Sequence, residues 1–299
     1  MPIWVPDPPA DGAANFPTFA LTRGGVTVWL TRPNGWYVSR GVEGLDTPPV
    51  GLVVDEPATW DGGLMRAARY APREVFLPVH LQASGNADLR AAVRALATLA
   101  DPKRGPVTLT VAHPDGVTRT IDGYLSGPFG QALIAAEALT WRKIGLRLRC
   151  PDPFFGGGSA AASLVVAASS VDFLGDPFLP LAVSDSQIAG TLTAVNDGDA
   201  DAYPRWTLTG PASSAVIDVA GAAWQLTAPL GAGSVLVVDA TRGAQSVTVD
   251  GTPAWGMLAS GSQLAPLPPG ATTVDVDITG ATGSTVLAAA WPQKWLTAW

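Results

Sequence analysis

The sequence predicts a mainly β protein of two domains, with a single α-helix in the first domain. Three observations support this fold class. The chain has 299 residues, a size at which one hydrophobic core usually stops growing and the chain divides. Its 33 glycines and 27 prolines suit many short elements joined by tight turns. Apolar residues recur at strand spacing along most of the chain, whereas helical spacing is clear only once.

Strands account for most of the first half. Segments 24–30, 48–57 and 73–83 combine apolar alternation with flanking turn residues. Pro78 lies inside the third segment and predicts either an edge position or a bulge, because proline cannot donate to a ladder. The segment 105–125 predicts a hairpin that turns at the sequence HPDG.

The first half ends on a strand with a clear apolar face. Ile144, Leu146, Leu148 and Cys150 alternate with arginines and a glycine. Trp141 is out of phase with this series, which predicts a bulge near Gly145.

One segment of the first half has helical spacing. Leu89, Val93 and Leu96 fall on one face, and Asn86 is the expected N-cap. Asp88 is favourably placed in the first turn, and the sequence from Pro102 to Gly105 ends the helix.

The second half predicts a β-sandwich. Short strand-like segments recur at regular spacing between Gly, Pro, Asn and Asp clusters, which is typical of two packed antiparallel sheets. The predicted strands are 163–169, 191–196, 205–210, 215–220, 223–228, 234–239, 245–250, 272–279 and 284–291.

A sharp break at the midpoint predicts the domain boundary. In the sequence RLRCPDPFFGGG (147–158), two prolines flank an acid, two phenylalanines follow, and three glycines come last. Proline denies the chain further ladder hydrogen bonds. We therefore predict domains at 1–155 and 156–299. The residues expected to pack the linker between them are Pro151, Asp152, Pro153, Phe154 and Phe155.

Charge differs between the two halves. Up to Cys150 there are fifteen basic and thirteen acidic residues, and beyond it three basic and twelve acidic. Neither half has the dense basic stripe that nucleic-acid binding needs, so we expect no sequence-specific nucleic-acid binding. The single cysteine excludes an intrachain disulfide. We expect neither a signal peptide nor membrane insertion.

Residues for nucleophilic catalysis are scarce. The chain has two histidines, His80 and His113, and no local motif marks a nucleophile beside either one. We interpret both as surface histidines and Cys150 as a small buried hydrophobic residue. The prediction is a protein with no catalytic, cofactor-binding or metal-binding residues.

Two short patterns resemble ligand motifs only in part. GGGSAA fits a dinucleotide fingerprint at Gly156, Gly158 and Ala161, but prolines precede it where a strand should run into a helix. NDGDADAYP (196–204) spaces Asp197, Asp199 and Asp201 like a calcium loop. The required later glycine and acid are absent, so we interpret this stretch as a polar turn.

Two tryptophans of the second half illustrate different environments. Trp206 alternates with Leu208 and is expected in the core. Trp255, in the loop PAWG, is the best candidate for an exposed ring that could stack on a sugar or anchor an interface.

Several stretches resemble, in order, the distal tail proteins of long, non-contractile-tailed phages, and the later ones resemble the branch found in actinobacterial phages. The resemblance covers nearly the whole chain and is weakest over the first forty residues. Its motifs are GVEGLDTPPVGLVVDE (41–56), DGGLMRAARYAPREVFLPVHLQ (61–82), LATLADPKRGPVTLTV (96–111), PDGVTRTIDGYL (114–125), LRCPDPFFGG (148–157), NDGDADAYPRWTLTGP (196–211) and WLTAW (295–299).

This resemblance implies a structural role in the virion. It implies a first domain related to the tail-tube protein that builds a hexameric ring, and a second, galectin-like sandwich that projects outward. The implied partners are further copies of the chain, the tail tube protein, the tail hub or tail-fibre-base protein, and the tape-measure protein. The implied location is the distal end of the tail, after assembly in the host cytoplasm. In such proteins PDPFF closes the last strand of the ring domain.

A carbohydrate-binding protein is the alternative, with a second sandwich that recognises host cell-surface glycan. The charge count favours the first half as the part that builds the ring, because oppositely charged patches can meet across a head-to-tail interface. Six copies of the acidic second half would repel one another if closely packed.

Overall fold

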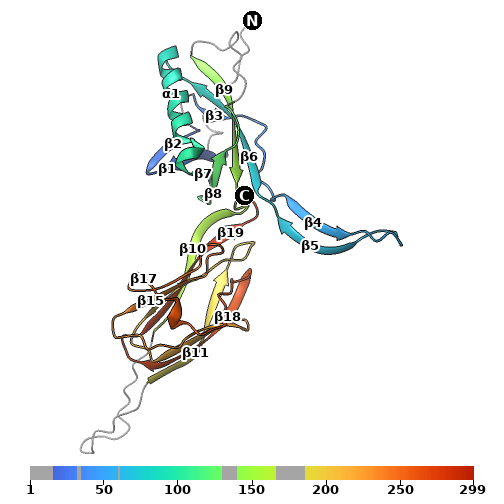
Figure 1. Cartoon of the computed structure of the whole chain (residues 1–299). Coiled ribbons are helices and arrows are strands. Elements are labelled where there is room, and N and C mark those ends of the chain that lie inside the picture. The colour runs from blue at the N-terminus through green and yellow to red at the C-terminus, as the bar shows by residue number, and fades with distance from the viewer. Residues whose placement is uncertain (1–15, 32–34, 60, 130–139, 166–185) are drawn as a thin grey trace, which may run out of the picture. The chain divides into compact units, whose positions relative to one another are not determined.

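The structure, a computed structural model, describes residues 16–31, 35–59, 61–129, 140–165 and 186–299 (Figure 1). The chain forms two compact units, and unit 1 is discontinuous. Unit 1 runs to Gly157 and also includes Trp295–Trp299, whereas unit 2 is Gly158–Lys294. The predicted division at 155/156 lies close to the first crossing. The second crossing, at Lys294 and Trp295, was not predicted.

The described residues are mainly β, with one α-helix, as the sequence predicts. The elements of unit 1 are β1 (Thr18–Arg23), β2 (Val26–Trp29), β3 (Tyr37–Val38), β4 (Val50–Asp55), β5 (Leu64–Tyr70), β6 (Arg73–Gln82), α1 (Asn86–Leu99), β7 (Val107–Ala112), β8 (Thr118–Leu125), β9 (Trp141–Cys150) and the start of β10 (Phe155–Val165).

Unit 1 is built from antiparallel strands that enclose one apolar core. One path of strands runs β8-β7-β1-β2, and a second places β6 between β3 and β9. Strand β8 joins the two, because Tyr124 and Leu125 also pair with β9. Alternate residues of β6 and β9 are buried, including Val75, Leu77 and Leu146, as their spacing predicts.

Helix α1 covers part of this core with Leu89, Leu96 and Leu99. Its N-cap is Gly85 rather than the predicted Asn86, and the cap makes no side-chain hydrogen bond. Instead, the Ser84 hydroxyl donates to the carboxylate of Asp88 in the first turn. Carbonyl oxygens at the C-terminal end of the helix accept hydrogen bonds from a residue of β1.

The cation at that end is Arg23, whose guanidinium donates to the carbonyl oxygens of Thr98 and Asp101. The helix has no basic residue in its own last turn. Arg23 therefore satisfies carbonyls that the helix leaves unpaired and complements its negative end.

The bulge expected in β9 is absent. The register of β6 and β9 is continuous from Arg73 to Gln82, so there is no bulge at Gly145 or Pro78. Gly145 is needed for another reason, since a Cβ there would lie 2.8 Å from the Phe76 ring. The position of Pro78 agrees with the edge alternative. On the side away from β9, strand β3 pairs only with Val79 and His80, and the Pro78 carbonyl accepts from the Ser39 amide just beyond the end of β3.

Unit 2 is a sandwich of two antiparallel sheets. One has the order β11-β18-β13-β14, and the other β17-β16-β15-β12-β19-β10. Their bounds are β11 (Ser186–Asn196), β12 (Arg205–Thr209), β13 (Ser214–Val219), β14 (Ala222–Leu226), β15 (Val235–Asp239), β16 (Ser246–Val249), β17 (Thr252–Pro253), β18 (Gly270–Ala281) and β19 (Val286–Trp295).

The inner faces of these sheets form the second core. Trp206, Trp224 and Trp291 are among its largest buried side chains, so the placement of Trp206 in the core is confirmed. The predicted strands of the second half are found close to their expected bounds. The exception is 163–169, of which residues 166–169 lie outside the described part of the chain.

Candidate functional site

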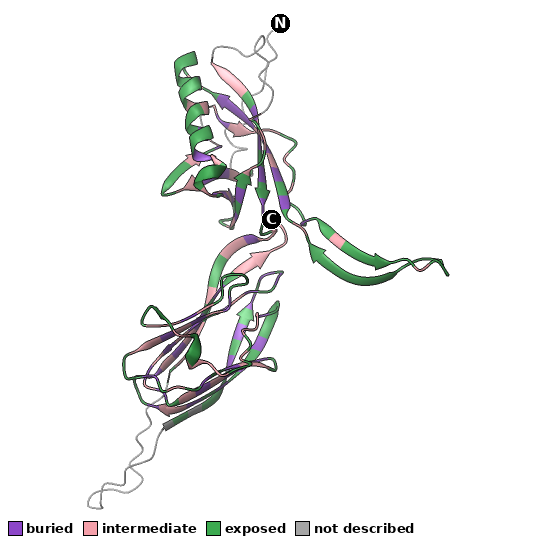
Figure 2. Ribbon diagram, viewed as in Figure 1, coloured by how far each residue is buried: buried purple, intermediate pink, exposed green. Residues whose placement is uncertain are grey.

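Strands β4 and β5 form a two-stranded sheet of their own, which we call the arm. Among the described residues they pair with each other and with no further strand. Figure 2 shows the arm almost entirely exposed. Leu52 and Met65 each expose 60% of their surface. No other described strand pair of this length lacks a buried face.

The arm has one apolar face and one mixed face. Directly opposed residues of an antiparallel pair share a face, and alternate residues of a strand share it too. The register pairs Val50 with Tyr70, Leu52 with Ala68, and Val54 with Met65. These six residues form the apolar face, and all are exposed.

A register shift keeps that face apolar. Between Val53 and Val54 the pairing jumps from Ala67 to Met65, so Arg66 is an inserted residue. The insertion returns Met65 to the side of Leu52. Arg66 reaches the mixed face, where its Nε lies 2.5 Å from a carboxylate oxygen of Asp55. Without the bulge, an arginine would take the place of Met65 on the apolar face.

Such an arm needs a partner surface. An isolated two-stranded ribbon is marginally stable in water, because it buries little apolar area. A contiguous exposed apolar face is typical of an interaction site. The arm is therefore the strongest candidate for an assembly contact in the described structure.

Short-range contacts hold the base of the arm. The amide of Ala71 donates to the carbonyl of Pro49 at 2.8 Å, which closes the ribbon where its two strands leave unit 1. Tyr70, the last residue of β5, packs edge-on against Phe154, with ring centres 5.4 Å apart. Arg73 follows at the start of β6.

Arg73 is a buried cation whose partners in unit 1 are backbone carbonyls. Its side chain is 1% exposed. Nη1 donates to Gly44 at 2.8 Å and to Asp46, Nε donates to Pro153 at 2.8 Å, and Nη2 donates to Leu296 at 2.6 Å. Burial lowers the pKa of Arg73 below its ordinary value, but arginine remains protonated in proteins. The guanidinium thus fastens three segments of backbone together.

The predicted linker residues form a turn that leads directly into β10. Pro151 and Asp152 are exposed, and an oxygen of Asp152 accepts from the Phe154 amide at 3.1 Å. Phe155 is fully buried, and its ring centre lies 4.6 Å from the Arg73 guanidinium carbon. Glycines 156–158 lie within β10 and are not an irregular linker, since Gly156 pairs with Thr120 of β8.

Residues Trp295–Trp299, which we call the return segment, complete unit 1. Ala298 is fully buried in its core. The Ala298 amide donates to Leu45 at 2.8 Å, and its carbonyl lies 2.6 Å from Nε2 of His113. Trp299 donates from Nε1 to the carboxylate of Asp46 at 2.8 Å.

The return segment also explains one glycine of the midpoint. The Arg119 guanidinium carbon lies 4.0 Å from the centre of the Trp295 ring. A Cβ at Gly157 would lie 2.6 Å from Nη1 of Arg119 and 2.8 Å from Nε1 of Trp295. A larger residue here would have to displace this stacked pair.

Neither histidine is the free surface residue that the sequence suggests. His80 is 9% exposed, because its ring is stacked between Tyr37 at 4.7 Å and Trp141 at 5.5 Å. Burial, and then Lys143 on the neighbouring strand, lower the pKa of His80. His113 is half-buried against the return segment. Strand pairing places Tyr37 and Trp141 against His80, so these rings cover a side chain that alternation alone assigns to solvent.

Cys150 is a buried hydrophobic residue, as predicted. It is fully buried, and burial raises the pKa of its thiol to about 12. Within the described residues, no group of three or more His, Cys, Asp or Glu side chains is placed to hold a metal.

The partial ligand motifs lie in ordinary strands and turns. Gly156, Gly158 and Ala161 all belong to β10, which does not run into a helix. The stretch after β11 is a turn organised by Asn196, a buried side chain that donates to the Ala200 and Leu267 carbonyls at 2.9 and 3.0 Å. This agrees with its interpretation as a polar turn.

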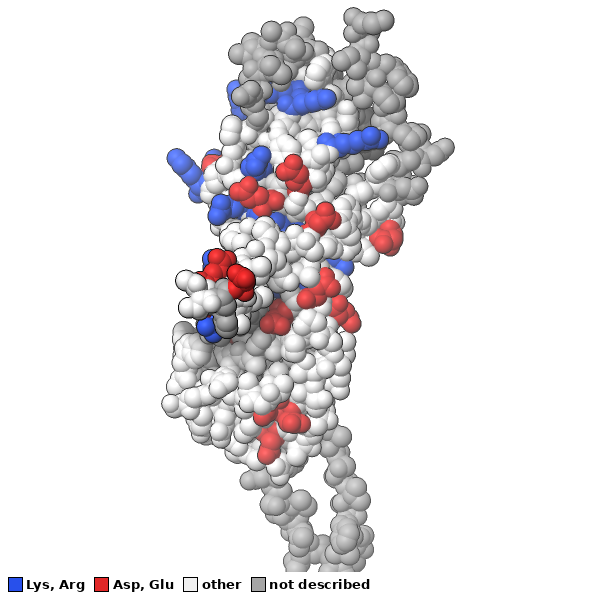
Figure 3. Space-filling model, turned by 90° about the vertical axis from the view of Figure 1, so that its right-hand side faces the viewer, with Lys and Arg blue, Asp and Glu red and all other residues white. Residues whose placement is uncertain are grey.

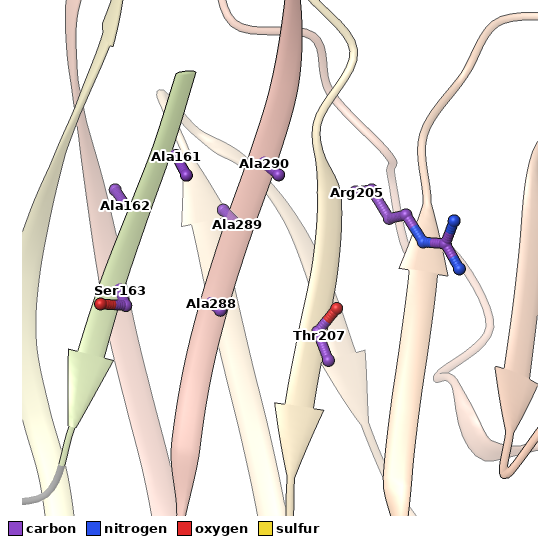
Figure 4. A pocket seen from close by; sticks show the side chains of 8 residues that line it. All are labelled: Ala161, Ala162, Ser163, Arg205, Thr207, Ala288, Ala289 and Ala290. Carbon is purple, nitrogen blue, oxygen red and sulfur yellow. The ribbon is translucent and has the colours of Figure 1, made fainter. Parts of the chain in front are cut away.

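Unit 2 offers two surface features. Trp255, at the start of a short 3-10 helix (Trp255–Met257), is 51% exposed, as expected. A shallow hollow of about 280 Å³ lies on the sheet formed by β10, β19 and β12 (Figure 4). Its lining is mostly small: Ala161, Ala162, Ser163, Arg205, Thr207, Ala288, Ala289 and Ala290. Of the described helices, none combines the length and apolar character that crossing a membrane requires.

Comparison with known proteins identifies the fold. No protein-family model matches the chain, and no curated protein sequence does so. Among solved structures, the SPP1 Dit protein matches with a TM-score of 0.65 and 16% identity, over 92% of this chain and 98% of that chain. The fold is that of SPP1 Dit. Coverage this extensive includes both units, so the resemblance to distal tail proteins is confirmed at the level of the fold.

SPP1 Dit is described as a paradigm of the hub adsorption apparatus in phages that infect Gram-positive bacteria. The phage P2 baseplate in its activated conformation with Ca matches at a TM-score of 0.48 and 7% identity, over 89% of this chain and 99% of that chain. The same baseplate with Sr gives a TM-score of 0.48 and 7% identity, over 90% and 99%.

Three parts of this site were not predicted from the sequence. Strand β5 has no strand-like pattern, because both its faces are exposed and Ala and Arg are good helix formers. The Arg73 cluster and the return segment depend on contacts between residues far apart in the chain. One signal was available: WLTAW (295–299) is mostly apolar, which favours a segment that packs against a hydrophobic core.

Proposed function

We propose that this chain is a structural virion protein at the distal end of a phage tail, where it forms a hexameric ring that joins the tail tube to the tail-tip hub. The observation that carries the proposal is the exposed apolar arm on a chain with the fold of SPP1 Dit. An adaptor works through surfaces that bind other copies and other proteins, and the arm is such a surface. The proposed role requires no catalysis and no cofactor.

Unit 1 is the proposed ring-forming part. A closed ring needs two different, complementary patches on each subunit. Unit 1 supplies the apolar arm, and on the face shown in Figure 3 its basic and acidic side chains are interspersed. Opposite charges can therefore meet across the interface. The excess of acidic residues beyond Cys150 favours a peripheral position for unit 2, where copies are separated by more than the ~10 Å over which salt screens charge.

The partners follow from this position in the tail. One face of the ring would contact the tail tube protein, and the other the hub or tail-fibre-base protein. The tape-measure protein and DNA would pass through the centre, without sequence-specific binding and without membrane insertion. Assembly would take place in the host cytoplasm, and the final location is the virion.

Within this role, we propose that Pro151, Asp152, Pro153, Phe154 and Phe155 fix the start of β10. Buried Phe155, the Arg73 contact to Pro153, and the Tyr70–Phe154 ring pair support this assignment. Their function is packing, with no ligand involved.

The test is the assembly state of the purified full-length protein. Light scattering should give a mass near six copies, and negative-stain electron microscopy should show rings with a central channel. A monomer at high protein concentration, with no ring in the images, would contradict the ring. Mixing with purified tail tube protein should then extend or cap the rings.

Glycan binding by unit 2 is the second candidate, because Trp255 presents an exposed ring. Aromatic rings that stack on sugars are exposed in this way, although they also anchor protein interfaces. Retention of the protein on host cell-wall glycan, abolished by Trp255→Ala, would support this candidate. Rings with no glycan retention favour the adaptor.

A further inference from the structure

The direction of the arm is set at its base. No residue of β4 or β5 belongs to the core of unit 1, and the exposed strands make no further pairing among the described residues. An arm that is to meet a neighbouring surface must nevertheless leave its own unit at a defined angle. The contacts that fix this angle therefore lie at the loop before β4 and at the residues after β5.

Arg73 joins these two places. It follows β5 by a few residues, and its Nη1 donates to the Gly44 and Asp46 carbonyls in the loop that precedes β4. A single buried guanidinium thus connects the entry and the exit of the arm. The Ala71–Pro49 hydrogen bond adds a second connection between the same two places.

The return segment contacts the same loop. Leu296 supplies the acceptor for Nη2 of Arg73, at 2.6 Å. The Ala298 amide donates to Leu45, and Trp299 donates to the side chain of Asp46. Two of these contacts reach the loop before β4 directly, and the Leu296 contact reaches it through Arg73. Ala298 is buried while making its contact.

We infer that the return segment is a positioning element for assembly: when Trp295–Trp299 is seated, it holds the loop Gly44–Asp46 and thereby orients the arm. The inference rests on the proposed role of the arm in ring formation. Because this segment follows unit 2 in the sequence, the chain must pass through unit 2 before the base of the arm is complete. Unit 2 then contributes to ring assembly through the chain order, without itself forming the ring.

The test separates orientation of the arm from assembly. Ala298→Glu cannot be accommodated in a fully buried site, so it should release the segment while leaving the rest of the chain unchanged. Hydrogen exchange at the Ala71 amide reports the base of the arm. It is measured in a Leu52→Asp background, in which assembly does not protect the arm. Exchange at α1 amides in the same sample shows whether unit 1 stays folded.

We expect Ala298→Glu to speed exchange at Ala71 about tenfold, as the loss of roughly one hydrogen bond implies, with α1 unaffected. Alone, the same substitution should prevent ring formation, whereas Ala298→Gly should behave as the unaltered protein. If α1 also loses protection, Trp299→Ala replaces Ala298→Glu, because it removes only the contacts of an exposed side chain with Asp46 and His113.

Unchanged exchange at Ala71 with either variant would overturn the inference. So would normal rings from Ala298→Glu despite faster exchange, because assembly would then not depend on the segment. If the unaltered protein forms no ring, the proposed function fails by itself. The exchange comparison in the Leu52→Asp background still decides whether the segment positions the arm.

Discussion

Arg73 donates to the carbonyl oxygen of Leu296 at 2.6 Å, and this bond joins residues 223 positions apart. It connects the first strand after the arm with the segment that follows unit 2. A buried charge that is solvated by backbone carbonyls depends on all of its acceptors being present. The junction is therefore expected to respond to changes in any of the segments that meet there.

Replacing Arg73 with methionine should lower the free energy of unfolding of unit 1 by about 3–5 kcal/mol. The substitution removes the donor from four backbone carbonyls in part-buried hydrogen bonds, and each buried acceptor left unsatisfied costs about 1–3 kcal/mol. Chemical denaturation followed by circular dichroism measures the change. Arg66→Met is the matched control, since Arg66 makes only an exposed ion pair, and it should cost no more than about 1 kcal/mol. Equal effects of the two substitutions would show that the cluster does not stabilise unit 1.

The two phenylalanines of the midpoint should differ in their importance. Phe155→Ala removes a fully buried ring and should cost about 3–5 kcal/mol in unfolding free energy. Phe154→Ala removes a half-buried ring that packs edge-on against Tyr70 and should cost about 1 kcal/mol. Thermal unfolding, with limited proteolysis near residue 155, tests both. Unchanged melting and protease resistance in a double variant would contradict the packing role.

His80 should make the stability of unit 1 depend on pH. Its pKa is lowered in the folded protein by burial and by Lys143, so the unfolded chain binds the proton first as pH falls. The stability that neutral His80 contributes is complete above its ordinary pKa of 6.5 and is lost as pH falls below it. His80→Gln should therefore show a smaller decrease in unfolding free energy between about pH 7 and pH 5. Parallel decreases in the two proteins would exclude this contribution.

Cys150 should be unreactive in the native protein. Its thiol is fully buried, and its pKa is raised to about 12, so little thiolate forms at mildly alkaline pH. Treatment with iodoacetamide, followed by mass spectrometry, should show negligible labelling of native protein and complete labelling in denaturant. Rapid native labelling would mean that the end of β9 opens readily.

Sequence patterns located the strands in which buried and exposed residues alternate. The alternation of Val75 and Leu77, or of Val274 and Val276, reflects one buried face of a strand, and period alone reveals it. Strand β5 has no such period, because it buries neither face in this chain. Its existence depends on its pairing with β4.

The candidate site was accessible to sequence analysis only in part. The prolines and phenylalanines after Cys150 mark the midpoint turn. Nothing local indicates that Arg73 lies beside Leu296 or that Ala298 completes the first core. Such contacts depend on how the chain returns from unit 2. The environment of His80 was missed for a similar reason, since Tyr37 and Trp141 lie on other strands.

The most direct test of the central claim, that unit 1 assembles through the apolar face of the arm, is the solution mass of three full-length proteins. Light scattering should give a hexamer for the unaltered chain and a monomer for Leu52→Asp, which places a charge on the apolar face. Val53→Asp makes the same change one residue later, on the mixed face, and should remain a hexamer. Equal masses for the two variants, or a hexamer that survives Leu52→Asp, would contradict the claim.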